Sequence, residues 1–168
     1  MKNILRTAAA VAALTLGATP ALAVPATQNA TATARIVKPL TLTSIQNLDL
    51  GTITLVGSGA TTVGLSRAGV FSCPVGNVTC SGAHQVAVYK VTGVNNQTVT
   101  VTAGDVLMDN QTDTTVKLLL DVDAPATVTI DNSSPTNGTD FPIGGSVSVS
   151  GTTLEGTYVG NFVVTVNY

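Results

Sequence analysis

Residues 156–168, which read GTYVGNFVVTVNY, alternate between apolar and polar side chains. The even positions hold the apolar residues Tyr158, Phe162, Val164, Val166 and Tyr168, whereas the odd positions include the polar residues Thr157, Asn161, Thr165 and Asn167. Successive side chains of a β-strand point to opposite faces, so a period of two places these residues on one face. We therefore expect a half-buried strand whose far edge is covered by the chain itself or by another molecule.

Shorter runs of the same kind fill the rest of the chain. One of them has apolar residues at alternate positions, Ala30, Ala32, Ala34 and Ile36; Pro39 interrupts it, and Leu40 and Leu42 resume it on the same face. Because proline removes one hydrogen-bond donor from a ladder, we expect this first strand to lie at a sheet edge.

Residues 85–92 carry apolar side chains on both faces, which predicts a central strand. Residues 98–103 follow after a turn and are expected to pair with that strand as a hairpin. Beyond residue 23, no run of ten or more residues has apolar side chains at helical spacing. The fold class we predict is all-β, with a single immunoglobulin-like β-sandwich domain over residues 24–168.

The first 23 residues have the features of a signal peptide. Lys2 and Arg6 precede a small apolar run, and Ala21 and Ala23 form an A-x-A cleavage site. We expect export through the inner membrane to the periplasm and then to the cell surface or medium. We expect no membrane-spanning segment, because the apolar run is shorter than the roughly 20 residues that a spanning helix needs. Losing two of seven basic residues leaves five against nine acidic ones, which disfavours nucleic acid as a partner.

Cys73 and Cys80 are the two cysteines of the chain. In an exported protein an isolated pair usually forms a disulfide, which is our prediction here, with free thiols as the alternative. Six residues separate them, a spacing that fits neither a redox C-x-x-C motif nor a four-ligand zinc site.

The sequence offers little for catalysis. His84 has no evident orienting partner, and Ser66 lies in GLSRA, which lacks the last glycine of a nucleophile elbow. The aspartates between Asp105 and Asp123 are interpreted as solvated loop carboxylates, with a weak calcium site as the alternative. We predict that the chain is not an enzyme and has no cofactor and no catalytic or metal site.

Three segments together resemble a known family: residues 48–53 (LDLGTI), residues 141–146 (FPIGGS) and the closing GTYVGNFVVTVNY. The chain resembles bacterial secreted proteins of the domain of unknown function 4402 family, and its closing strand is similar to that of spore-coat-U-type and chaperone-usher pilin subunits. In those pilins the sandwich lacks its last strand. A periplasmic chaperone fills the groove first, and an N-terminal extension of the next subunit fills it after assembly at an outer-membrane usher.

The resemblance implies roles for two sets of residues. Tyr158, Phe162, Val164, Val166 and Tyr168 would line one wall of a groove and offer a pairing edge, and Ala30, Ala32, Ala34 and Ile36 would belong to a donor segment. Strand addition of this kind gives affinity through main-chain hydrogen bonds and register through alternate side chains. The function we predict is a structural subunit of a surface fibre or adhesive layer, whose partners are copies of itself or related subunits, a chaperone and an usher. The alternative is a self-contained secreted module that binds carbohydrate or a surface protein.

Overall fold

A computed structural model describes residues 25–134 and 136–168. The expected signal peptide, residues 1–23, lies outside the described residues. The chain divides into two units, of which the first ends at Arg35 and the second is Ile36–Tyr168. The described part of the first unit, residues 25–35, forms no helix or strand. Within the described ranges, no helix is long and apolar enough to cross a membrane.

The second unit is built from β-strands, and its described residues form no helix. The strands are β1 (Thr41–Gln46), β2 (Thr52–Leu55), β3 (Thr61–Leu65), β4 (Phe71–Ser72), β5 (Val78–Ser81), β6 (Ala87–Thr92), β7 (Thr98–Ala103), β8 (Val106–Asn110), β9 (Lys117–Asp123), β10 (Thr127–Thr129), β11 (Thr139–Val149), β12 (Tyr158–Val159) and β13 (Val164–Asn167).

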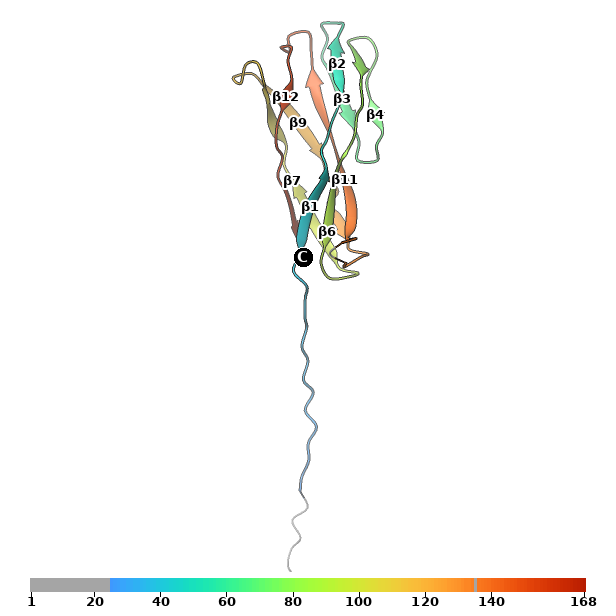
Figure 1. Ribbon diagram of the computed structural model, residues 1–168, viewed down its shortest axis with the longest axis vertical. Helices are drawn as coiled ribbons and strands as arrows, with labels where there is room; N and C mark the ends of the chain where they lie inside the picture. The colour runs from blue at the N-terminus through green and yellow to red at the C-terminus, as the bar shows by residue number, and fades with distance from the viewer. Residues whose placement is uncertain (1–24, 135) are drawn as a thin grey trace, which may run out of the picture. The chain divides into compact units, whose positions relative to one another are not determined.

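The strands form two layers, and within each layer successive short strands continue the same line of hydrogen-bond pairing. In the first layer, β1 runs into β2 along one edge (Figure 1), and the two pair antiparallel with β6 and β5. A bridge between Asp49 and Gln85 joins the two parts of this ladder. In the second layer, β7 and β8 pair with β10 and β9 on one side and with β13 and β12 on the other.

β11 crosses from the first layer to the second. Its first half pairs with β6, and its second half pairs with β9 and with β3, which in turn pairs with β4. The crossing falls at Gly144, where pairing with β6 ends and pairing with β9 begins. A Cβ atom at this position would overlap the carbonyl oxygen of Leu65 and lie 2.6 Å from the backbone nitrogen of Arg67. Sandwich strands change sheets at such bends, and glycine permits the close approach of β3.

Two apolar clusters lie between the layers. The first joins β6 and the first half of β11 to the second layer, with buried residues Ala87, Val91, Val99, Val101, Ile130, Phe141 and Ile143. The second joins β5 to β3, β9 and the second half of β11, with buried residues Val63, Val78, Leu120, Val147 and Val149. The predicted all-β sandwich is therefore confirmed.

The sequence interpretation differs from the structure at two places. The first strand lies at a sheet edge as expected, but it begins at Thr41, after Pro39, and residues 30–36 form no strand. Residues 87–92 form a central strand as expected, because β6 lies between β1 and β11, but the expected hairpin with residues 98–103 is wrong. Both edges of β6 are already paired, so the turn after Thr92 carries the chain into the other layer, where β7 pairs with β10 and β13.

Candidate functional site

Two edges of the sandwich that border the same opening have no partner strand among the described residues. Along the first layer the edge consists of β1 and β2, each paired on one side only. Along the second layer it consists of β12 and β13, which pair on one side with β8 and β7. An unpaired edge presents a row of N–H and C=O groups that can template pairing with another strand.

A groove of about 1250 Å³ opens between these edges. Its two rims are continuous stretches of chain, residues 47–55 from the first layer and residues 151–162 from the second. Its floor is apolar and comes from four strands: Ala87, Tyr89, Met108, Leu118, Leu120, Val147 and Val149. A groove with an apolar floor, bordered by unpaired strand edges, is suited to an extended peptide rather than to a compact ligand.

The groove exists because the first layer is too narrow at this end of the sandwich. There it has two strands, β2 and β5, opposite the six formed by β12, β8, β9, β11, β3 and β4. Leu120 is 4% exposed on the inner face of β9, whereas Leu118 on the same face is only partly buried, as is Met108 on β8. Burial of the inner face therefore declines from β11 towards β12.

The closing stretch behaves largely as its alternation predicts. The even-numbered residues from 158 to 166 are partly buried and the odd-numbered ones are exposed, although residues 160–163 divide the stretch into β12 and β13. Tyr158 and Phe162 line the groove. Val164 and Val166 instead pack against the first apolar cluster, beyond the groove.

Tyr168 closes the opening at the β13 end. Its hydroxyl donates a hydrogen bond to the carbonyl oxygen of Lys38 (2.9 Å) and accepts one from the N–H of Val94 (3.0 Å). Figure 1 shows the C-terminus beside the start of β1, in agreement with this contact. The expected wall residues are thus divided between the groove, the core next to it and a tie across its closed end.

The rim formed by residues 151–162 is held by Asn110, which the sequence analysis did not single out. Asn110 is 1% exposed and its amide nitrogen donates to the carbonyl oxygen of Glu155 at 2.8 Å. Its amide oxygen accepts from the N–H groups of Thr112 (2.8 Å) and Asp113 (3.3 Å). Gly156 has a φ of 139°, and a Cβ there would lie 2.5 Å from the Asn110 side chain. The rim can therefore pack against Asn110 in this way only with glycine at position 156.

Cys73 and Cys80 form the predicted disulfide. It links the segment after β4 to β5, and both cysteines pack against the second apolar cluster. The bridge therefore connects the narrow first layer to the β3–β4 edge of the second. His84 stacks on Phe71 beside this region, with ring centroids 4.2 Å apart.

The residues expected in a donor segment lie before the first strand. Ala30, Ala32 and Ala34 fall in residues 25–35, which form no strand, and Ile36 begins the second unit. The Ile36 side chain is 92% exposed. No strand of the described chain contains any of these four residues.

Three of the aspartates between Asp105 and Asp123 bond to different neighbours. Asp109 pairs with Lys117, and Asp123 pairs with Arg67. Asp113 accepts hydrogen bonds from the hydroxyl and the N–H of Thr115, which hold the pKa of its carboxyl below the usual value. Within residues 25–134 and 136–168, no three His, Cys, Asp or Glu side chains gather as a metal site.

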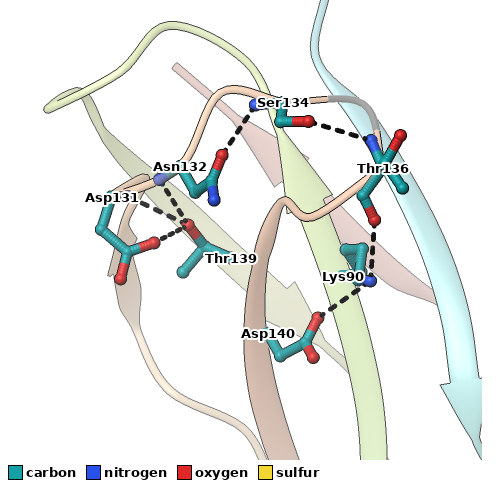
Figure 2. Close-up of polar contacts among 7 residues, drawn as sticks. All are labelled: Lys90, Asp131, Asn132, Ser134, Thr136, Thr139 and Asp140. Carbon is teal, nitrogen blue, oxygen red and sulfur yellow. Dashed lines mark hydrogen bonds and ion pairs between the residues drawn. The ribbon is translucent and has the colours of Figure 1, made fainter.

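A polar cluster pins the loop between β10 and β11 (Figure 2). Thr139 accepts hydrogen bonds from the N–H groups of Asp131 (3.0 Å) and Asn132 (3.3 Å) and donates one to the Asp131 carboxylate. Lys90 donates to the carbonyl oxygen of Thr136 at 3.2 Å and pairs with the carboxylate of Asp140. Since these groups bond to one another across the loop, we assign the cluster a structural role.

Residues 40–168 match the family described as Domain of unknown function (DUF4402). No curated protein matches the chain, and no solved structure does.

Proposed function

The chain belongs to the DUF4402 family, a domain of unknown function, and we propose that it is a structural subunit of a surface fibre or adhesive layer, assembled by β-strand addition. The observation that carries the proposal is the groove of about 1250 Å³, which has an apolar floor and whose two rims include the unpaired edges of β2 and β12. A sandwich with such an opening gains stability when an extended segment covers the floor and pairs with an edge.

The partners in this proposal are copies of the chain or related subunits. The donor segment contains Ala30, Ala32, Ala34 and Ile36, which alternate with polar residues and form no strand in their own chain. A periplasmic chaperone covers the groove before assembly, and an outer-membrane usher is the site of strand exchange. Export by the N-terminal signal peptide brings the subunit to that compartment.

Denaturing gels of material sheared from cells that express the chain test this proposal. Strand exchange predicts a ladder of oligomers in unheated samples that collapses on boiling to one band near the mature mass. A stable soluble monomer, giving one band in both lanes, would remove the fibre proposal and favour the self-contained binding module.

Two leucines of β9 provide a matched pair of variants. Leu118→Gln places an amide in the apolar floor of the groove, and we expect it to abolish the ladder. Leu119→Gln changes the neighbouring residue, which is exposed and does not line the groove, and should leave the ladder intact. Thermal unfolding of both variants checks that the sandwich itself remains folded.

A further inference from the structure

A second hollow lies on the outer face of the sandwich. Its volume is about 460 Å³, and it is formed by the β3–β4 hairpin, the second half of β11 and the end of β9. None of the residues that line it also lines the groove. A segment that fills the groove therefore leaves this hollow open to solvent.

One row of opposed residues crosses the hollow. In the ladders, Gly64 of β3 lies opposite Ser72 on one side and Ser146 on the other. Ser146 in turn lies opposite Asp121 of β9. Because glycine has no side chain, a gap remains between the two serines, which two strand spacings separate by about 10 Å. The gap has room for one sugar ring, with a hydroxyl group at each end and a carboxylate beyond one of them.

Asp121 is the carboxylate that is available to a ligand. Its side chain is exposed and makes no hydrogen bond or ion pair within the described part of the chain. Asp123, which also lines the hollow, is already engaged, because it accepts from the N–H of Arg67 (3.0 Å) and pairs with the guanidinium group. An ionised carboxylate only accepts hydrogen bonds, and its two oxygens suit two neighbouring hydroxyl donors.

The hairpin that forms one wall is fixed before any ligand arrives. Within its turn, the N–H of Ser66 donates to the carbonyl oxygen of Val70 (3.0 Å), and the Ser66 hydroxyl accepts from the N–H of Val70 (3.2 Å). Arg67 joins the turn to the end of β9 through Asp123 and through the carbonyl oxygen of Ala124, at 2.9 Å. A preorganised wall spares the ligand the entropic cost of ordering it.

The rest of the lining suits a neutral polyol. Val70 is 67% exposed and supplies an aliphatic wall that can contact the C–H groups of a sugar ring. The hydroxyls of Ser72 and Ser146 can each donate and accept hydrogen bonds, as sugar hydroxyls do. Among the described residues that line the hollow none is basic, which disfavours an anion. A single available carboxylate offers too few ligands for a metal ion.

We infer that this hollow binds a saccharide. The ring lies over Gly64, two neighbouring hydroxyls donate to the carboxylate of Asp121, and Ser72 and Ser146 bond to other oxygens of the sugar. The inference does not depend on the proposed fibre, because the hollow stays open however the groove is filled.

Two-dimensional NMR of the isotope-labelled protein tests the inference, with the methyl glycosides of glucose, galactose and mannose as probes. We expect at least one of them to shift the amide signals of Gly64, Asp121 and Ser146 saturably. The glucoside with every hydroxyl methylated is the matched control and should shift none of them, because it has no hydroxyl to donate. Shifts from none of the three sugars, or shifts confined to groove residues such as Leu118 and Tyr158, would overturn the inference.

A pair of aspartate variants locates the contact. Asp121→Ala should weaken sugar binding by about tenfold or more, because it removes hydrogen bonds to a charged acceptor. Asp140→Ala is the matched control and should leave binding unchanged, since Asp140 is exposed, lies outside the hollow and forms only a surface ion pair with Lys90. Thermal unfolding of the Asp121 variant should match that of the parent, because the side chain it removes has no bond to lose. Unchanged binding by Asp121→Ala, or an equal loss in both variants, would refute the assignment.

Discussion

Asn110→Ala is expected to destabilise the sandwich and release one rim of the groove. The substitution removes the hydrogen bond to the carbonyl oxygen of Glu155 and the two that the side chain accepts from Thr112 and Asp113. A hydrogen bond contributes about 1 kcal/mol net, so three give about 3 kcal/mol of lost unfolding free energy. The small cavity left at a site that is 1% exposed adds to this loss.

Urea denaturation followed by circular dichroism measures this effect. The midpoint should fall at an unchanged m-value, because the amount of surface exposed on unfolding stays the same. Asn137→Ala is the control, since Asn137 is exposed in the loop before β11 and should change the free energy by less than about 0.5 kcal/mol. A loss below about 1 kcal/mol for Asn110→Ala would refute the reasoning, because water would then be replacing the amide at the rim.

Three further predictions concern the scaffold and its loops. Gly144→Ala should prevent folding or lower the melting temperature strongly because its Cβ overlaps β3, whereas Gly104→Ala, with open space at that position, should be tolerated. Cys73→Ser should lower the unfolding free energy by up to about 2.5 kcal/mol in denaturant titration, the loop-closure value for so short a loop. Thr115→Val should raise the pKa of Asp113 towards its usual value in a carbon NMR titration, since both hydrogen bonds that lower it come from Thr115 and the hydroxyl bond is lost. The stabilisation from this lowered pKa is present above the usual pKa and is lost as the pH falls through the lowered one. The variant should therefore lose less stability in acid than the parent. An unchanged pKa of Asp113 in the variant would contradict the assignment.

The period-two patterns predicted much of the sandwich because they depend only on strand geometry. From Tyr158 to Val166 the even side chains turn inwards, as the alternation requires, and the two cysteines bond as their isolation in the sequence suggests. The same reasoning failed for Ala30, Ala32, Ala34 and Ile36. Alternation shows that a segment can be a strand, but a strand also needs a partner, and no described strand of this chain pairs with residues 30–36.

Pairing partners were harder to predict than strands. Residues 85–92 and 98–103 are neighbours in the sequence with a turn between them, which favoured a hairpin. The edges of β6 are occupied by β1 and β11, and β11 lies about fifty residues further along the chain. A local pattern contains no information about so distant a competitor for an edge.

Leu118 and Leu120 explain why the groove was not visible in the sequence. They are the same residue type, on the same strand and the same face, and both line the groove floor, yet Leu120 is 4% exposed whereas Leu118 is only partly buried. The difference arises because the first layer has only two strands at this end of the sandwich, opposite six in the second layer. Sequence alternation indicates which side chains favour burial, and only the arrangement of the two layers determines which of them are covered. An uncovered apolar face beside an unpaired edge is thus a property of the assembled sandwich, and it is the property from which strand addition follows.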